Sequence, residues 1–416
     1  MRANCYGTEC GRRLRKHRFG LLVCVLCASV VNLPAQDFKT VVPGIEYAEV
    51  TREIDKQPVR MNLLRLDLSK VRLDVVHAMD AAIGLEKTSS IATRHGAFAA
   101  INGGFFRMDD SIWAGDPQGI FMIDGKLLSE SINNRVALII GNGNRSRFQG
   151  IHRLSTINSF RVGKQPGSNP INLSGIDRER KINDIILYDH FFGKRTRTDD
   201  SGIELILSGC TVEREPRGYP FNMCRRIDTK IGSGNNLIPS DGFVISFSSA
   251  DMSEWQDFVS ESSKNGLAKT RKIFIENAYG LDEDTLLIPD PYTDIVGGVP
   301  QLIKSGKIDI TWEQEKTNKT FVETKHPRTA VANLKDGKFL MITVDGRSES
   351  SGGISLTDLA AFLLEIGAVD AMNLDGGGSS TMFLDGKVVN HPSDKDGERK
   401  VSDAILVTLR KRPKKK

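Results

Sequence analysis

The stretch AMNLDGGGSST, Ala371–Thr381, holds an amide, a carboxylate, three glycines and three hydroxyl side chains within eleven residues. Ala371–Leu374 is short and apolar enough for a buried strand, and Thr381–Leu384 resumes strand character before an Asp-Gly turn. Glycines adopt positive φ without steric cost, and successive backbone N–H groups in such a break bind anions. No lysine follows them, so the stretch is not a Walker A loop. We predict a phosphate-sized anion site here, the alternative being a plain Gly-rich turn.

A second stretch resembles the first. His95–Asn102 can be laid on Ile366–Asn373 at a constant offset, with Gly, Ala, Ala and Asn identical. Each copy is followed by an Asp-Gly-Lys hairpin, FMIDGKLL at Phe121–Leu128 and MFLDGKVV at Met382–Val389, for which Asp-Gly favours a type I′ turn. These patterns predict two related strand-loop-hairpin halves, with chance similarity between short buried strands as the alternative.

The N-terminal residues have the pattern of a secretory signal. Basic residues precede an apolar run at Phe19–Val31 that is shorter than the roughly 20 residues needed to span a bilayer. We therefore expect residues 1–36 to be a signal peptide and the protein to be secreted or periplasmic, without a membrane span. The remaining chain keeps Cys210 and Cys224, fourteen residues apart. In an exported chain this spacing predicts one disulfide, and two free thiols are the alternative.

The net charge of +5 is carried by the two ends of the chain. The first 20 residues contribute +5 and Arg410–Lys416 contribute +6, so the part between them has a net charge of −6. This mildly acidic body gives no support for a nucleic-acid partner, and residues 411–416 are expected to be a solvated basic tail. No long Pro/Ser-rich linker divides residues 37–410, so we expect a single domain with a divergent middle at about 140–290.

Periodicity and turn signals predict an α+β protein in which strands predominate. The clearest strands are Ile45–Thr51, Val59–Asp67, Val71–Val76, Ile203–Leu207, Phe243–Phe247, Lys272–Ile275 and Phe339–Val344. Helices are expected through Arg94 after a Thr88 or Ser89 cap, over residues 251–267, and over Leu356–Ile366 after a Ser355 or Thr357 cap. Arg328 and Arg347 lie at the two ends of a predicted hairpin, and a guanidinium offers a planar fork that matches two phosphate oxygens.

Six motifs together resemble the phosphodiester glycosidase family. They are AINGGFF (Ala100–Phe106), GGVPQLIKSGK (Gly297–Lys307), HPRTAV (His326–Val331), MITVDGR (Met341–Arg347), AMNLDGGGSSTM (Ala371–Met382) and ERKVSDAILV (Glu398–Val407). The resemblance is strong near residue 100 and from about 290 to 408. It implies a large, twisted, mixed β-sheet with a few flanking helices, whose Gly-rich loops converge on one cleft. It also implies hydrolysis of a sugar 1-phosphodiester, similar to an N-acetylglucosamine-1-phosphodiester, to free sugar and phosphomonoester.

The resemblance and the residue chemistry together suggest roles for the polar side chains. Asp375 is the preferred carboxylate for acid/base or nucleophilic catalysis, and Asp345 is the second. Each precedes a glycine, so the alternative is that it only shapes a turn. His326 is a candidate proton donor, and a structural role for a histidine that precedes proline is the alternative. The expected substrate-binding residues are Asn102, Gly103, Gly104, Arg328, Thr329, Arg347, Asn373, Gly376, Gly377, Gly378, Ser379, Ser380 and Arg399. For Arg399 a solvated ion pair is the alternative.

No cofactor is required by these motifs. Asp345, Asp375 and nearby carbonyls offer an alternative Ca²⁺ site, but no dedicated calcium-loop spacing is present. The expected partner is a glycosyl phosphodiester or a surface glycopolymer. A non-catalytic carbohydrate-binding or exopolysaccharide-binding protein on the same scaffold is the second functional hypothesis.

Overall fold

The computed structural model describes residues 37–143, 147–162, 171–214, 220–249, 253, 268–277, 286–287 and 292–410. The predicted signal peptide, the basic tail at 411–416 and, Ser253 apart, the predicted helix at 251–267 lie outside these ranges. Within the described residues, no helix combines the length and apolar character needed to cross a lipid bilayer.

An eight-stranded sheet carries most of the predicted site, and each of its neighbouring strand pairs is antiparallel. In spatial order its strands are β1 (Lys39–Val42), β2 (Ile45–Ile54), β3 (Gln57–Leu66), β25 (Phe339–Val344), β24 (Arg328–Leu334), β26 (Ala368–Asn373), β22 (Gln301–Lys304) and β23 (Lys307–Ile308). Helix α4 (Leu356–Glu365) packs its buried face on this sheet, and the short helix α3 (Lys319–Glu323) packs beside it. The Ser355 hydroxyl accepts a hydrogen bond from Asp358 N, as expected for an N-cap.

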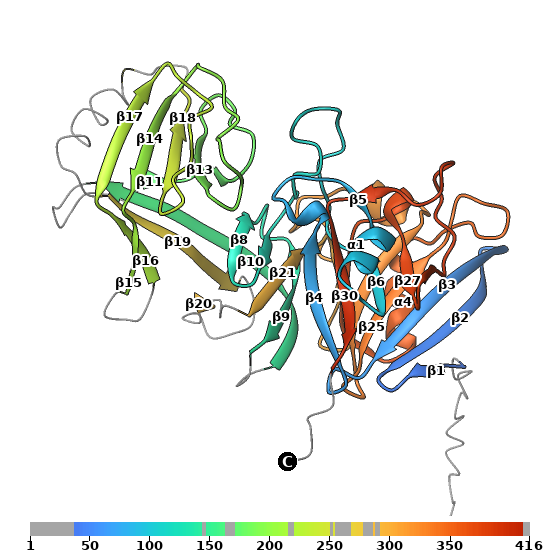
Figure 1. The fold of residues 1–416 in the computed structure, drawn as a ribbon. Coiled ribbons are helices and arrows are strands. Elements are labelled where there is room, and N and C mark those ends of the chain that lie inside the picture. The colour runs from blue at the N-terminus through green and yellow to red at the C-terminus, as the bar shows by residue number, and fades with distance from the viewer. Residues whose placement is uncertain are drawn as a thin grey trace, which may run out of the picture. The chain divides into compact units, whose positions relative to one another are not determined.

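A five-stranded antiparallel sheet supplies the other half of the site. Its order is β28 (Lys387–Val388), β27 (Met382–Leu384), β6 (Ala99–Asn102), β30 (Asp403–Leu409) and β4 (Val71–His77). Helix α1 (Thr88–Arg94) packs on β6, β27 and β30 (Figure 1). Three short elements complete this region: η1 (Ala78–Asp80), η2 (Gly377–Ser379) and a small ladder of β5 (Glu86–Lys87) with β29 (Lys400–Val401).

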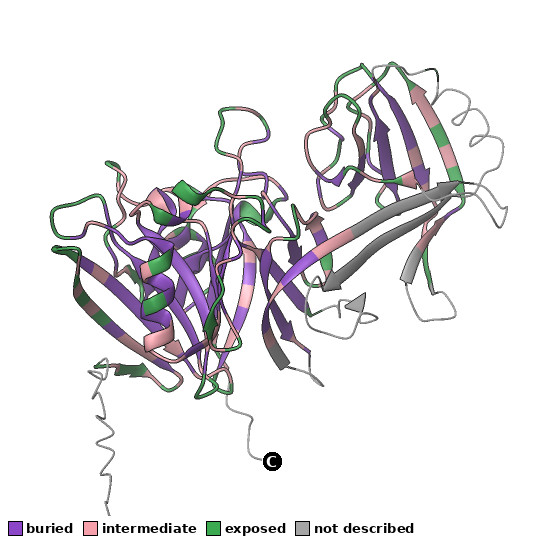
Figure 2. Ribbon diagram, turned by 180° about the vertical axis from the view of Figure 1, so that it is seen from behind, coloured by how far each residue is buried: buried purple, intermediate pink, exposed green. Residues whose placement is uncertain are grey.

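Apolar side chains of both sheets meet in one hydrophobic core. Leu64 on β3, Met341 on β25, Met372 on β26, Ile101 on β6 and Ile405 on β30 are all fully buried in it. Central strands are therefore buried over most of their length, while hairpin tips are exposed (Figure 2). This packing fixes the strand ends from which the predicted site loops emerge.

The remaining strands belong largely to the middle of the chain. A ten-stranded sheet contains β15 (Thr211–Arg214), β16 (Pro220–Cys224), β19 (Ala268–Asn277), β10 (Arg147–Val162), β9 (Val136–Asn142), β21 (Thr293–Gly297), β7 (Phe121–Ile123) and β8 (Lys126–Ser129), with β11 (Ile171–Asn172) beside β10 and β20 (Leu286–Leu287) beside β19. A further five-stranded sheet contains β12 (Gly175–Ile176), β13 (Ile185–Asp189), β18 (Phe243–Phe247), β14 (Ile203–Ser208) and β17 (Arg226–Ile231).

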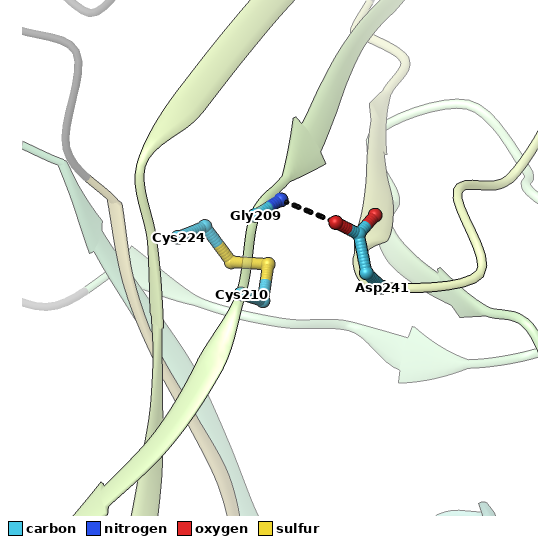
Figure 3. The surroundings of a disulfide bond; sticks show 4 residues. All are labelled: Gly209, Cys210, Cys224 and Asp241. Atoms are coloured by element: carbon cyan, nitrogen blue, oxygen red, sulfur yellow. Dashed lines mark hydrogen bonds between the residues drawn. A yellow bond between two sulfur atoms is a disulfide. The ribbon is translucent and has the colours of Figure 1, made fainter.

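Cys210 and Cys224 form the predicted disulfide at the base of the β15–β16 hairpin (Figure 3). The neighbouring Gly209 N–H donates to the Asp241 carboxylate at 3.0 Å, which ties the same strand end to the loop before β18. The prediction of one disulfide is therefore confirmed.

Most local predictions are confirmed, and the sheet arrangement needs a correction. Both Asp-Gly-Lys hairpins form, and positive φ at Asp124, Gly125, Asp385 and Gly386 matches the predicted type I′ turns. The α+β class with few helices is correct. The described strands, however, form several sheets in place of one large sheet, because the chain after each glycine-rich break continues into a different ladder. That the two hairpin units are related halves stays a prediction.

Candidate active site

The glycine loop, residues 374–381, connects β26 to β27 and packs on the segment before β24. Gly377 has φ of 61° and its N–H donates to the Pro327 carbonyl at 2.9 Å. A Cβ on Gly376 would lie 2.8 Å from the same carbonyl oxygen, closer than real Cβ contacts allow. The glycines are therefore required both for the turn and for close approach to the HPRT segment.

Asn102 fixes this loop from the neighbouring sheet. Its side-chain N–H donates to the Asp375 carbonyl at 2.8 Å, while its Oδ1 accepts from the Thr329 hydroxyl and from Thr381 N. Asn373 likewise donates to the Val299 carbonyl at 2.7 Å. Both amides are buried. These contacts favour a role in holding loops together, and the predicted role of the two asparagines in binding sugar stays a prediction.

Asp375 lies at the centre of the loop with its carboxyl group turned inward. Oδ1 accepts from Gly376 N at 2.9 Å, whereas Oδ2 is inaccessible to water and has no hydrogen-bond partner in the described structure. Burial, with a smaller contribution from the charge of Asp403, outweighs the lowering effects of the Ser379 hydroxyl, Gly376 N–H and Arg399 and raises the pKa of Asp375 to about 6. The Ser379 hydroxyl lies near this carboxylate without a hydrogen bond of normal geometry. A carboxyl group with this pKa can exchange a proton near neutral pH.

Asp403, at the start of β30, is a second buried acid that the sequence reasoning missed. Its Oδ1 accepts from Gly104 N at 2.9 Å and its Oδ2 accepts from the Ser402 hydroxyl. A Cβ on Gly103 would lie 1.9 Å from Asp403 Oδ1, which explains why this position holds glycine. Burial raises the pKa of Asp403 to about 6. Its position inside the ERKVSDAILV motif could have identified Asp403 as a site residue from the sequence.

Asp345 follows β25 and is also buried. Its Oδ1 accepts from Asn390 Nδ2 at 3.2 Å and His391 N at 3.0 Å, and Arg60 Nε lies 4.0 Å from its Oδ2. Burial raises the pKa of Asp345. Asn390 Nδ2 also donates to the Ser380 carbonyl at 3.0 Å, so one amide joins Asp345 to the glycine loop. This carboxylate thus supports the loop, and its catalytic role stays a prediction.

Two guanidinium groups lie over the middle of the glycine loop. Arg347 is exposed, and its Nη2 lies 3.0 Å from the position a Cβ would take on Gly377. Arg399 Nη2 lies 2.3 Å from the corresponding position on Gly378, and this arginine makes a two-point ion pair with Asp394. Arg347 and Arg399 therefore each approach one glycine of the loop, and their role in binding an anion stays a prediction.

Arg328 is placed differently from these two arginines. It is 2% exposed, its Nη2 donates to the carbonyls of Phe321 and Thr324 at 2.7 and 2.8 Å, and its Nε donates to Ile354 O at 3.3 Å. Burial lowers the pKa of Arg328 to about 10. These contacts favour a role in folding, and its predicted role as a phosphate ligand stays untested.

The other predicted side chains border the loop. His326 is half-buried and pairs through its backbone with Ile354, and burial together with the Arg328 and Arg347 charges lowers its pKa. Neutral imidazole is therefore its ordinary form at pH 7. The hydroxyls of Ser379 and Ser380 are buried without a hydrogen-bond partner in the described structure.

No three His, Cys, Asp or Glu side chains of the described residues are grouped so that they could hold a metal ion. The Ca²⁺ alternative stays untested. A cavity of about 550 Å³ is lined by residues of β4, β8 and β30 and by Asp294, and none of the predicted site residues lines it. The carboxylates with raised pKa values, Asp375 and Asp403, lie instead at or beside the glycine loop, where Arg347 and Arg399 approach Gly377 and Gly378.

Residues 226–408 match the model of the phosphodiester glycosidase family. The resemblance to this family is therefore confirmed. The bovine (Bos taurus) N-acetylglucosamine-1-phosphodiester alpha-N-acetylglucosaminidase is 38% identical over 125 residues, which cover 28% of this chain and 24% of that enzyme. The matched segment thus spans about a quarter of this curated relative.

Two solved structures share the fold over most of the chain. A hypothetical protein from Synechocystis aligns with a TM-score of 0.69 and 21% identity, covering 91% of this chain and 64% of its own. A putative exported protein from Burkholderia pseudomallei aligns with a TM-score of 0.66 and 22% identity, covering 85% of this chain and 74% of its own. At this identity the likeness concerns the fold alone.

Proposed function

We propose that the protein is an exported phosphodiester glycosidase that hydrolyses a sugar 1-phosphodiester, of the N-acetylglucosamine-1-phosphodiester kind, to free sugar and phosphomonoester. The observation that carries this proposal is the grouping of Asp375 with two guanidinium groups around Gly377 and Gly378. The family match at residues 226–408 and the activity named for the bovine relative support the same reaction class.

The arginines bind the diester in this proposal. Arg347 approaches Gly377 and Arg399 approaches the adjacent Gly378, so their forks can hold the non-bridging phosphate oxygens while the glycine backbone leaves room for the ester. In this proposal the Asp375 carboxylate, whose Oδ2 is closed to water in the free protein, becomes accessible to the anomeric carbon of the sugar when the phosphate binds on this side. Placement of the reacting bond beside a fixed carboxylate is the main contribution that such a site can make.

Asp375 then acts on the anomeric carbon. Its carboxylate either attacks this carbon, forming a glycosyl ester that water then hydrolyses, or removes a proton from the attacking water. In both routes the bond between the carbon and the phosphate oxygen breaks. The electron pair of that bond leaves with the phosphate, and the water supplies the new sugar hydroxyl. Because a phosphate leaves more easily than an alcohol, strong protonation of the leaving oxygen is not required. Asp403 contributes by maintaining the raised pKa of Asp375.

Purified protein incubated with a UDP-linked or aryl α-GlcNAc phosphodiester tests this function. We expect release of free sugar, abolished in Asp375→Asn and retained in Asp385→Asn, which changes an exposed aspartate in a hairpin turn. Binding of the substrate without any release would support the non-catalytic carbohydrate-binding alternative.

A further inference from the structure

A segment over residues 390–399, between β28 and β29, covers the glycine loop. At its start, Asn390 donates to the Ser380 carbonyl at 3.0 Å. Near its end, the Glu398 carboxylate accepts from the backbone N–H and the hydroxyl of Ser89, at the start of α1. Between these anchors, Ser393 accepts a hydrogen bond from Arg347 at 3.4 Å. The covering segment is therefore fixed at both ends and contacts one of the two arginines of the anion site.

Asp394 in this segment holds the other arginine. Arg399 Nε lies 2.7 Å from Asp394 Oδ2, and Arg399 Nη2 lies 3.0 Å from Asp394 Oδ1, so both carboxylate oxygens face the guanidinium fork. Asp394 Oδ1 also lies 2.2 Å from the position a Cβ would take on Gly378. A negatively charged oxygen thus rests directly on the loop glycine that the sequence predicts to receive phosphate.

The pair remains open to solvent. The side chains of Asp394 and Arg399 are 30% and 25% exposed, so an anion from solution can reach the guanidinium. Two carboxylate oxygens on a guanidinium fork have the same geometry as two phosphate oxygens. An ion pair with this exposure is also weak enough to be exchanged for another anion.

We propose that Asp394 is a resident anion that the phosphate of the substrate replaces on Arg399. The inference rests on the proposed function, because it assigns Arg399 to the phosphate. The Asp394 carboxylate keeps Arg399 in place in the free protein. Because an incoming anion must replace this carboxylate, the affinity of the site for anions is lower. The exchange also favours release of the phosphomonoester product, since the Asp394 carboxylate recaptures the guanidinium as the product departs.

Titration calorimetry with inorganic phosphate at constant pH and ionic strength tests the exchange without requiring turnover. Asp394→Asn keeps the shape of the side chain but removes its charge, so phosphate should bind about threefold to tenfold more tightly than to the wild type. Asp396→Asn is the matched control, because this exposed aspartate in the same segment carries the same charge. Its phosphate affinity should stay within about twofold of the wild type.

The arginine variants separate the possible failures. In an Arg399→Ala background phosphate binding should fall, and adding Asp394→Asn should change it no further. Weaker phosphate binding in Asp394→Asn would mean that Asp394 only positions Arg399, and equal gains in Asp394→Asn and Asp396→Asn would mean a general charge effect. Either result overturns the inference while leaving the hydrolase proposal intact. Unchanged binding in Arg399→Ala removes Arg399 from the anion site and overturns both the inference and the proposed phosphate contact.

Thermal unfolding of each variant shows whether it is folded. If Asp394→Asn does not fold, Asp394→Ser removes the same charge with a smaller side chain and carries the same expectation. Asp394→Glu retains the charge and should bind phosphate no more tightly than the wild type. Tighter binding in Asp394→Glu would contradict the exchange.

Discussion

Replacing Asp375 by asparagine should stabilise the folded protein at pH 8 and have a much smaller effect at pH 4. Burial raises the pKa of Asp375 from 3.8 to about 6, so the folded state binds this proton more tightly than the unfolded state. The resulting stability is fully present below about pH 4 and is lost as the pH rises through about 6. A difference of about 2 pKa units corresponds to a loss of at most about 3 kcal/mol in the free energy of unfolding when Asp375 ionises. Asparagine does not ionise, so the variant avoids this loss.

Urea unfolding of both proteins at pH 4 and pH 8 measures this difference. The free energy of unfolding of Asp375→Asn minus that of the wild type should be about 1–3 kcal/mol larger at pH 8 than at pH 4, meaning that the variant is relatively more stable at pH 8. Asp385→Asn, in an exposed turn, should show no such pH dependence. An Asp375→Asn effect of the same size at both pH values would refute the claim that the wild-type carboxylate is held in an unfavourable buried position.

Three further predictions concern the supports of the site. Gly103→Ala should lower the melting temperature and sugar release together, because its Cβ would lie 1.9 Å from Asp403 Oδ1; unchanged stability and activity would contradict the described packing. Arg328→Met should cost about 2–4 kcal/mol in urea unfolding, because three carbonyls lose their donor, and a folded variant with selectively weakened phosphate binding would restore Arg328 as a phosphate ligand. Cys210→Ser with Cys224→Ser should lower stability by about 3 kcal/mol and leave the pH dependence of activity unchanged, and a shifted pH profile would link the disulfide to the site.

Local chemistry was sufficient to predict the hairpins and the main helix. Asp124-Gly125 and Asp385-Gly386 adopt positive φ for reasons contained in two residues, and Ser355 caps α4 through a hydrogen bond that spans three residues. The glycine loop was predictable for a similar reason, because its unusual density of glycines and polar side chains is visible in one short stretch. These features depend little on distant parts of the chain.

The direction of each side chain in the site depended on contacts that the sequence does not reveal. Arg328 and Arg399 are both arginines in conspicuous motifs, yet Arg328 turns inward to backbone carbonyls while Arg399 lies on Gly378. Asp403 was missed because its hydrogen bond to Gly104 joins residues 299 positions apart. The arrangement of strands into several sheets escaped prediction for the same reason, since β6 and β26 have similar sequences but different neighbours.

The central claim is tested most directly by hydrolysis in water enriched in ¹⁸O. With a GlcNAc 1-phosphodiester as substrate, cleavage of the bond between the anomeric carbon and the phosphate oxygen should give a phosphomonoester that carries no ¹⁸O, because the oxygen of the water goes to the sugar. Asp375→Asn should abolish this reaction. A phosphomonoester that carries ¹⁸O, or undiminished sugar release by Asp375→Asn, would contradict the account of Asp375 acting on the anomeric carbon.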